Sequence, residues 1–211
     1  MDRSLNIRIV DHPLVAHFVA HLRDVRTKPA LFRTLTNHLT LLLAWEATRD
    51  LPLRPLTVET PLERADAQVL AGEPLVIVPI LRAGLGMLSS LVEMFPEVSV
   101  GYIGLARDHT TAVASSYYCK LPPVAGRRTL LVDPMLATGG SACQAIEAVK
   151  EAGGTDIRLL CVVAAPEGVA VVNERHPDVP IIGAALDHAL NQNRYIVPGL
   201  GDFGDRLYGT L

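Results

Sequence analysis

The sequence predicts an α/β fold in which helices flank a mostly parallel central sheet, and three observations point to this class. Short, continuous apolar runs, among them LVIVPI at 75–80 and RLLCVVAAP at 158–166, suit strands that are buried on both faces. Segments whose apolar residues recur at helical spacing alternate with these runs along the chain. Charged residues directly follow several of the runs, at the carboxyl edge of a parallel sheet where ligands commonly bind.

Composition supports a single domain that covers residues 1–211. The chain is 49% apolar and 19% charged, so it can bury a substantial core. Its formal net charge of -3 gives no electrostatic argument for nucleic acid as the main partner. The cysteines form no CxxC pair and the histidines show no metal-ligand spacing, so neither a disulfide framework nor a zinc site is expected. Because the sequence contains no membrane-length apolar run and no signal peptide, a cytoplasmic location is expected.

Residues 1–60 are expected to be helical. One apolar helical face carries Leu14, Val15, Phe18, Val19 and Leu22, and a second carries Leu35, Leu39, Leu42 and Leu43 with Glu46. The prolines at 52, 55 and 61 are expected to end this region. The apolar run at 75–80 then predicts a central strand, and RAGLGMLSSLVEMF at 82–95 predicts the next helix.

The run VSVGYIGLAR at 98–107 predicts a second strand. The polar segment from Arg107 to Pro123 that follows is too long for a tight turn, and it carries a predicted β arm around Tyr117, Tyr118 and Lys120. A mobile flap and a plain surface hairpin both fit this segment.

The second half of the chain continues the alternation. Residues 129–132 predict a buried strand, and Ala142, Ile146 and Val149 recur at helical spacing after it. A strand at 158–166, a helix from Glu167 to Arg175 and a strand at 181–187 follow. Residues 191–210 contain four glycines and a proline, so an irregular segment is expected there, with backbone groups free to face a ligand or water.

A Thr-Gly-Gly-Ser turn at 138–141 lies between a buried strand and an amphipathic helix. Unpaired N–H groups and the positive end of the helix dipole attract anions at such a place, and the glycines let a phosphate approach the backbone. Asp133 ends the strand and could accept two ribose hydroxyls from a sugar phosphate bound at the turn. A plain strand-turn-helix capped by Ser141 also fits the turn alone. Arg82, Arg107 and Asp187 likewise fall near the ends of predicted strands.

These segments resemble a known family. VDPMLATGGS at 132–141 is similar to the phosphoribosyl diphosphate (PRPP) motif of type I phosphoribosyltransferases, in the variant of the uracil phosphoribosyltransferase family. PILRAG at 79–84 resembles the diphosphate loop of that family, and YIVPGLGD at 195–202 resembles its uracil-binding loop. Further similar segments, such as HPLVAHFVAHLRD and VAAPEG, extend the resemblance almost end to end.

The resemblance implies a set of site residues. PRPP would be bound by Arg82, Arg107, Asp133, Pro134, Met135, Leu136, Ala137, Thr138, Gly139, Gly140, Ser141 and Asp202. Uracil would be contacted by Ile196, Gly201, Asp202 and Phe203, the last three largely through their backbone. Catalysis would depend on Asp133, Arg107 and Asp202. Bacterial members commonly have alanine where this chain has Phe203.

The resemblance also implies the reaction and the overall plan. The enzyme would transfer the 5-phosphoribosyl group of PRPP to N1 of uracil, giving UMP and diphosphate, on a type I phosphoribosyltransferase-like fold with a helical N-terminal segment, a β-arm flap and a C-terminal base-binding loop. Mg²⁺ would be carried on PRPP without a direct protein ligand and reached from Asp202 through water, since Pro134 stands where many relatives have a second acid. A homo-oligomer, dimer or tetramer, is the family expectation. The residues do not decide whether a purine nucleotide such as GTP activates the enzyme.

Two other functions stay open. A transferase for a different base would keep the motif at 132–141, but the loop YIVPGLGD argues against it. A non-catalytic regulator on the same fold would bind nucleotide and RNA, and the scattered arginines provide no basic stripe for that role.

Overall fold

The computed structural model describes residues 5–107 and 114–210, with only the backbone described at 106, 107 and 114–116. Within these residues one large sheet forms the centre of the molecule, in the order β1-β11-β10-β8-β4-β6-β7. All neighbouring pairs along this order are parallel except β6 and β7, which are antiparallel. The predicted mostly parallel α/β fold is therefore confirmed.

The strands of this sheet are β1 (Ile7–Ile9), β4 (Val76–Leu81), β5 (Ser99–Val100), β6 (Tyr102–Arg107), β7 (Ala114–Lys120), β8 (Arg128–Val132), β9 (Met135–Leu136), β10 (Asp156–Ala164) and β11 (Ile181–Leu186). The short strands β5 and β9 lie off the main order and pair with β4 and β10. The predicted strand at 98–107 is therefore divided at Gly101 into β5 and β6, both of which pair with β4.

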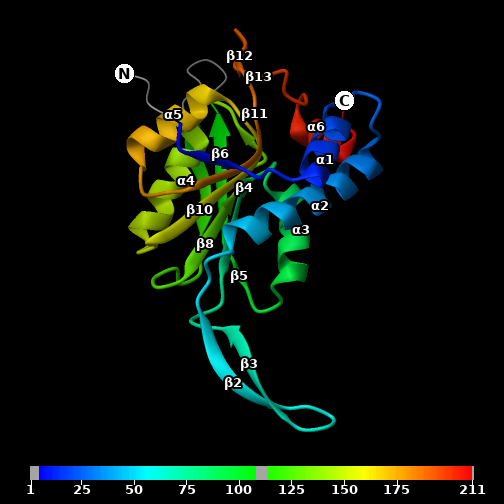
Figure 1. Ribbon diagram of the computed structural model, residues 1–211. Helices are drawn as coiled ribbons and strands as arrows, with labels where there is room; N and C mark the ends of the chain where they lie inside the picture. The colour runs from blue at the N-terminus through cyan, green and yellow to red at the C-terminus, as the bar shows by residue number, and fades with distance from the viewer. Residues whose placement is uncertain (1–4, 108–113, 211) are drawn as a thin grey trace.

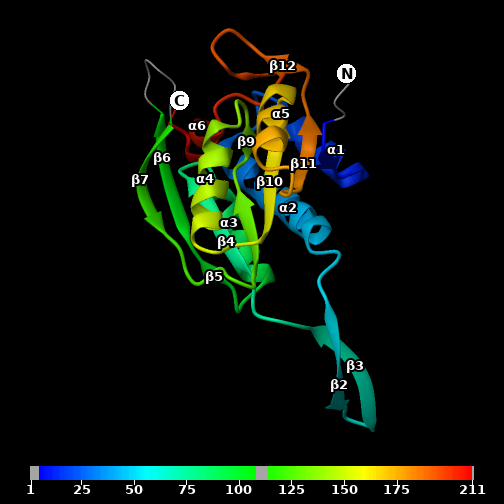
Figure 2. The same ribbon diagram turned by 90° about the vertical axis from the view of Figure 1, so that its left-hand side faces the viewer.

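Helices cover both faces of the sheet, as Figures 1 and 2 show. They are α1 (Pro13–Arg23), α2 (Pro29–Ala47), α3 (Leu85–Met94), α4 (Gly140–Glu151), α5 (Pro166–Arg175) and α6 (Phe203–Tyr208). In Figure 1, α4 and α5 lie to the left of the sheet, whereas α1, α2, α3 and α6 lie to its right. The molecule thus has three layers.

The apolar core is divided by the sheet into two clusters. Successive strand side chains point to opposite faces, so Val76 and Val78 join the cluster under α4 and α5, whereas Ile77 joins the cluster under α1, α2 and α3. Leu130 and Leu131 on β8 divide in the same way. Burial on both faces explains why these strands read as continuous apolar runs.

The chain order creates a switch point between β4 and β8. After β4 the chain passes through α3 to β6 on one side of β4, and it later returns to β8 on the other side. Because α3 and α4 lie on opposite faces of the sheet, a crevice opens between the carboxyl ends of β4 and β8. Arg82 follows β4 and Asp133 follows β8, so both residues border this crevice.

The structure contains a β-hairpin that the sequence did not predict. The expectation that residues 1–60 are helical was therefore wrong for the part of this hairpin that they include. The strands β2 (Leu53–Glu59) and β3 (Arg64–Leu70) pair antiparallel as a separate two-stranded sheet, which projects from the body in Figures 1 and 2. Pro55 lies inside β2, which is tolerated because a two-stranded sheet has only edge strands. The strand β1 is a second departure from the helical expectation, although α1 and α2 are helices as predicted.

The C-terminal segment is more regular than expected. Two short strands, β12 (Ala189–Leu190) and β13 (Ile196–Val197), pair antiparallel, and α6 follows. Asp202 caps α6 by accepting a hydrogen bond from the N–H of Asp205, and Gly209 ends the helix with a φ of 73°. The prediction of a fully irregular segment at 191–210 was therefore wrong, because these two capping positions allow a short helix between glycines.

Candidate functional site

A cavity of about 680 Å³ lies at the crevice between β4 and β8. Four of its lining residues come from distant parts of the sequence, namely Arg82 after β4, Asp133 after β8, Ser141 in α4 and Asp202 before α6. The fold thus brings together residues from all three motifs that the sequence singled out. Cationic, carboxylate and hydroxyl groups in one open cavity suit a polar, charged ligand.

Asp133 is half-buried at the carboxyl end of β8. Its backbone N–H donates to the carbonyl of Leu160 on β10 at 3.1 Å, which ties it to the sheet. Its Oδ1 accepts a hydrogen bond from the N–H of Met135 at 3.3 Å. Burial, and to a lesser extent the charge of the nearby Asp133, raises the pKa of the Cys161 thiol. The carboxylate is therefore anchored to the sheet edge and lines the cavity.

The 138–141 turn has the backbone that an anion site requires. Gly139 has a φ of 81°, and a Cβ there would lie 2.8 Å from the carbonyl oxygen of Gly168, so this position demands glycine. At Gly140 a Cβ would meet only Thr138 Oγ1, at 3.9 Å. Ser141 lies inside α4, whose N-cap is Gly139, so Ser141 is not the cap. No N-cap side chain accepts a hydrogen bond from the first-turn N–H groups of α4.

Residues 134–137 connect Asp133 to this turn and are fastened to β10 by the backbone. The carbonyl of Pro134 accepts hydrogen bonds from Val162 and Val163 at 3.0 and 3.1 Å, and that of Leu136 accepts one from Ala165 at 2.9 Å. The side chain of Leu136 is in the core. Met135 and Ala137 instead line the cavities described here. Among the described residues, Pro134 and Leu136 line neither cavity, so any contact they make with a ligand would come from their backbone.

The structure describes the side chain of Arg82 but only the backbone of Arg107. Arg82 is exposed and lines the cavity, directly after the cis peptide bond that joins it to Leu81. Arg107 is the last residue of β6, the strand next to β4, so its backbone lies at the same edge of the sheet. The side chain of Arg107 and residues 108–113 lie outside the described part of the chain, so the predicted closure of a flap remains a prediction. The β arm around Tyr117 and Lys120 is confirmed as β7.

A second, smaller cavity of about 240 Å³ shares lining residues with the first. Met135, Asp202 and Phe203 line both, so the two cavities adjoin. All four predicted base-binding residues are among its lining, since Ile196 and Gly201 accompany Asp202 and Phe203. The loop 193–195 completes it from the β12–β13 hairpin. A small cavity joined to a larger polar one suits a planar base attached to a charged sugar phosphate.

The Phe203 ring is mainly a core side chain. It is 2% exposed, and its centroid lies 5.3 Å from that of Phe32 on α2, with an interplanar angle of 66°. A Cβ on Gly86 would approach the Phe203 ring within 3.1 Å, so α3 also packs closely against it. The large side chain therefore anchors α6 to α2 and α3, in addition to lining the base cavity.

Several residues near the site were missed by sequence reasoning. Asp205, Tyr208 and Thr210 line the larger cavity because α6 and the residues after it fold back over the crevice. Asp187 was placed correctly at the end of β11, but it is buried in an ion pair with Arg23 instead of lining a cavity. The sequence contains no local signal for this pair, since the two residues are 164 positions apart.

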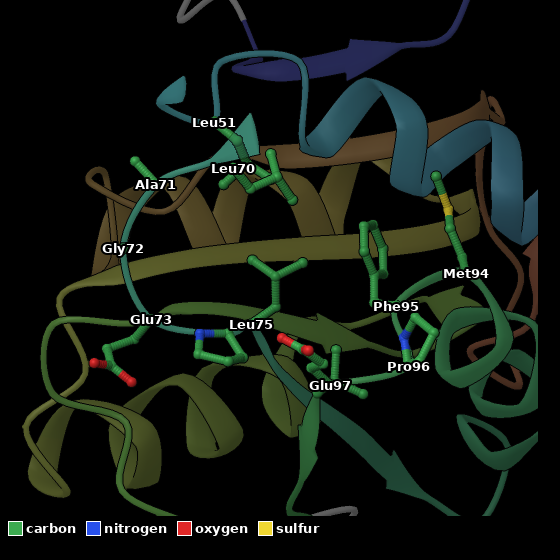
Figure 3. A pocket seen from close by; sticks show the side chains of 12 residues that line it. Leu51, Leu70, Ala71, Gly72, Glu73, Leu75, Met94, Phe95, Pro96 and Glu97 are labelled. Carbon is green, nitrogen blue, oxygen red and sulfur yellow. The ribbon is translucent and has the colours of Figure 1, made fainter. Parts of the chain in front are cut away.

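An apolar cavity of about 370 Å³ lies elsewhere, where the β2–β3 hairpin joins the body (Figure 3). Leu70, Leu75 and Phe95 gather around it, whereas the carboxylate of Glu73 points away. Leu75 immediately precedes β4, so this cavity is at the amino ends of the strands. It is therefore at the opposite edge of the sheet from Arg82 and Asp133, away from the edge where α/β folds bind their ligands.

In residues 5–107 and 114–210, no group of three or more His, Cys, Asp or Glu side chains could hold a metal ion. No helix in the described part of the chain has the length and apolar character needed to cross a membrane.

Comparisons with known proteins agree on one family. A family model described as "Uracil phosphoribosyltransferase" matches residues 9–210. The uracil phosphoribosyltransferase of Symbiobacterium thermophilum is 54% identical over 203 residues, covering 96% of this chain and 97% of that protein. That of Halalkalibacterium halodurans is 52% identical over 205 residues, covering 97% and 98%.

Solved structures agree with the fold. The structure of the AQ2163 protein from Aquifex aeolicus is similar with a TM-score of 0.91 and 36% identity, covering 96% of this chain and 97% of that one. An orotate phosphoribosyltransferase of Mycobacterium tuberculosis, solved in complex with PRPP, is similar with a TM-score of 0.50 and 17% identity, covering 83% and 90%. The second likeness concerns the fold alone.

Proposed function

The chain belongs to the uracil phosphoribosyltransferase family, and we propose that the two adjoining cavities are its active site, in one domain spanning residues 1–211. The family's enzymes serve pyrimidine salvage by transferring the 5-phosphoribosyl group of PRPP to N1 of uracil, with release of diphosphate. The observation that carries the proposal is the lining of the larger cavity, where Arg82, Asp133, Ser141 and Asp202 meet.

The larger cavity binds PRPP. The Asp133 carboxylate accepts hydrogen bonds from the ribose hydroxyls. The 5-phosphate lies against the 138–141 turn, at the N-terminus of α4. Residues 134–137 contribute through the backbone that joins these two points. The twelve-residue helix α4 supplies N–H groups and the positive end of its dipole to the phosphate, and Thr138 and Ser141 add hydroxyl donors.

The diphosphate of PRPP is the leaving group, and the protein stabilises its charge. As the bond at ribose C1 breaks, the sugar gains oxocarbenium character and the diphosphate gains negative charge. The Arg82 guanidinium, at the mouth of the crevice, donates to the diphosphate oxygens, and Arg107 does so from the neighbouring strand β6. Catalysis then consists mainly of placement and charge stabilisation, without a covalent enzyme intermediate.

Mg²⁺ is proposed as the cofactor. Carboxylate oxygens are the ligands that Mg²⁺ prefers, and the carboxylates of Asp133 and Asp202 line one cavity, so the donors suit an ion carried mainly on PRPP. Asp202 would reach such an ion through water, while its Oδ1 accepts the N–H of Asp205. The ion would neutralise diphosphate charge when bound.

The smaller cavity binds uracil. Gly201, Asp202 and Phe203 present backbone groups to the uracil edge, and the buried Ile196 side chain packs against its plane. Uracil offers an acceptor at O4 and a donor at N3, which a fixed backbone can pair with. The shared lining residues Met135 and Asp202 lie where the base and the ribose must meet, so N1 is aimed toward C1.

The enzyme is proposed to be a cytoplasmic homo-oligomer, a dimer or a tetramer. The projecting β2–β3 hairpin supports self-association because it exposes large apolar side chains. These are Leu53, Leu56, Leu62 and Leu70. The three cysteines are free, and two of them are buried, which suits the reducing cytoplasm.

The experiment that tests the function is incubation of the purified protein with PRPP, Mg²⁺ and each nucleobase in turn. UMP formation from uracil, with little nucleotide from hypoxanthine, guanine, adenine or cytosine, is the expected result. Nucleotide formed from a purine in preference to uracil would overturn the assignment of the smaller cavity to uracil.

A further inference from the structure

We propose that the half-buried Arg23 and the buried Asp187 form a positioning pair that holds the uracil-binding loop in its working conformation. This inference rests on the proposed uracil site. Neither residue lines the two cavities, so the pair would act through the backbone of Gly199 instead of touching a substrate.

The pair joins the end of α1 to the end of β11. Asp187 directly follows β11 and is 6% exposed, and Arg23 is the last residue of α1. The guanidinium donates to both carboxylate oxygens, with Nη1 at 2.8 Å from Oδ2 and Nη2 hydrogen-bonded to Oδ1. A bidentate pair of this kind fixes orientation as well as distance.

The same two side chains bind both backbone groups of Gly199. Arg23 Nη1 donates to the Gly199 carbonyl at 2.7 Å, and the Gly199 N–H donates to Asp187 Oδ2 at 2.8 Å. Gly199 has a φ of 59°, and a Cβ there would lie 2.2 Å from the carbonyl oxygen of Ile196. The loop therefore requires glycine at this residue, which lies two positions before Gly201 and three after Ile196. Both of these residues line the proposed uracil cavity.

A second arginine fastens the next residue of the loop. Arg206 Nη1 donates to the carbonyl of Leu200 at 2.8 Å and to that of Leu22, and its Nη2 donates to the carbonyl of Asp24 at 2.6 Å. Its guanidinium lies over the Phe32 ring, 4.6 Å from the centroid. The end of α1 thus anchors the Gly199 carbonyl directly through Arg23, and the Leu200 carbonyl indirectly through Arg206.

The chemistry of the pair favours positioning over stability. The Asp187 side chain is 3% exposed and that of Arg23 is 25% exposed, so the pair loses much of its hydration. Removing charges from water is costly, and a well-packed apolar pair in the same place would often give equal or greater stability. An Arg-carboxylate pair supplies what an apolar pair cannot, namely a donor and an acceptor for a loop residue outside helix and sheet. Because backbone groups of the loop are proposed to hydrogen-bond with uracil, a small shift of the loop would lengthen these hydrogen bonds and weaken uracil binding.

The test uses steady-state kinetics of the full-length enzyme, with uracil and PRPP varied separately. Asp187→Asn keeps the shape but removes the charge and one acceptor, so we expect KM for uracil to rise at least about tenfold while KM for PRPP stays within about twofold. Arg23→Gln should have a similar effect, and Arg23→Lys should recover part of it because it restores the charge without the fork. Asp178→Asn is the matched control, since Asp178 forms an exposed ion pair with Lys150 at 2.7 Å on α4.

Each outcome decides the matter. An unchanged KM for uracil in Asp187→Asn and Arg23→Gln, or equal increases for both substrates, would overturn the proposal even if thermal stability falls. If Asp187→Asn fails to fold, the two Arg23 variants decide in the same way. Ile196→Ala separates this inference from the proposed site, because Ile196 lines the cavity itself. If Ile196→Ala raises KM for uracil and the pair variants do not, only the pair is wrong; if Ile196→Ala has no effect, the proposed uracil site fails and the inference fails with it.

Discussion

At the scale of single residues, the site depends on side chains whose roles differ although their types are the same. Asp133 lines the larger cavity, Asp202 lines both cavities while capping α6, and Asp187 lines neither because it is buried against Arg23. Three aspartates near the carboxyl edge of the sheet therefore have different surroundings, and we propose that Asp133 and Asp202 bind ligands whereas Asp187 positions the loop. Burial and partners decide this division.

The first prediction concerns Asp133. Asp133→Asn keeps the size of the side chain but removes its charge, so two charge-assisted hydrogen bonds to ribose hydroxyls would weaken by about 1.5–3 kcal/mol each. PRPP affinity and kcat should both fall by a factor of ten or more, with thermal stability little changed. Steady-state kinetics and PRPP titration calorimetry measure this. Kinetics equal to those of the native enzyme would contradict the proposal that Asp133 binds the ribose.

The second prediction concerns the pH dependence of stability. Burial, with the nearby Lys150 ammonium, lowers the pKa of His176 below its ordinary value of 6.5, and His176 Nε2 has no hydrogen-bond partner among the described residues. Between the folded and the unfolded pKa the unfolded chain binds the extra proton, so the free energy of unfolding should fall as pH drops through this window.

Urea unfolding at about pH 7.5 and about pH 5.5 measures this effect. His176→Gln should lose less stability between the two pH values than the native protein does. The exposed His188 provides the control variant His188→Gln, which should behave as the native protein. An equal pH dependence for all three proteins would contradict the prediction.

At the scale of elements, the strand-turn-helix unit β8-turn-α4 carries the proposed phosphate site, and the two glycines of its turn differ in their surroundings. Gly139 satisfies the backbone, since its φ is 81° and its Cβ position is blocked. Gly140 has no positive φ and has space at the Cβ position, so the fold does not require glycine there, and we propose that the phosphate of PRPP does. This difference separates a folding requirement from a binding requirement within one turn.

The third prediction follows from that difference. Gly140→Val should abolish PRPP binding without lowering the melting temperature, because valine has a higher helix propensity than glycine and the nearest atom to a Cβ there, Thr138 Oγ1, is 3.9 Å away. Gly139→Ala should instead destabilise the fold by about 1–3 kcal/mol. Calorimetric titration and thermal unfolding of both variants measure the contrast. Normal PRPP binding by Gly140→Val would place the phosphate elsewhere.

The fourth prediction concerns the β2–β3 hairpin. Leu53 pairs directly with Leu70, so residues 54–69 can be replaced by an Asn-Gly turn without straining the body. Because the hairpin exposes its leucines, we expect its removal to reduce the mass of the assembly, measured by sedimentation equilibrium, while the far-UV circular dichroism of the body is retained. The control is Val25→Ser, which removes an apolar side chain that is 89% exposed outside the hairpin. An unchanged mass after hairpin removal would exclude the hairpin from the interface.

At the scale of the whole molecule, the proposed uracil cavity depends on both ends of the chain. Residues 22–24 anchor a loop at 199–200, and Met135 from the centre of the chain lines both cavities. The site exists only when the N-terminal helices, the sheet and the C-terminal segment are packed together. Base choice is therefore a property of the assembled fold.

The fifth prediction is the resulting base choice. Cytosine reverses the donor and acceptor that uracil presents at positions 4 and 3, so a fixed backbone would set like groups against each other. Unpaired buried polar groups cost about 1–3 kcal/mol each, and hydrogen-bonding sites of this kind reject analogues by factors on the order of 10⁴. Comparing kcat/KM for uracil and cytosine at saturating PRPP measures this. Values within about tenfold of each other would exclude backbone readout by this loop.

The sequence alone determined the parallel strands of the central sheet around the site. The runs at 75–80, 129–132, 158–166 and 181–187 are parallel strands as predicted, because burial on both faces selects continuous apolar residues. It also predicted that Arg82 and Asp133 would lie at one sheet edge, since carboxyl ends of parallel strands share an edge. Resemblance to the family then identified the loop at 195–202, which lies at the smaller cavity.

Only the tertiary structure decided the rest. Most side chains of the β2–β3 hairpin are exposed, so its sequence lacks the apolar pattern that predicts a buried strand. Its prolines were therefore interpreted as the end of a helical region. The short helix α6 depends on caps at Asp202 and Gly209 and on packing of Phe203 against Phe32. The pairing of Arg23 with Asp187 joins residues 164 positions apart. Periodicity and turn chemistry act over a few residues, whereas such contacts form only after the sheet brings distant segments together.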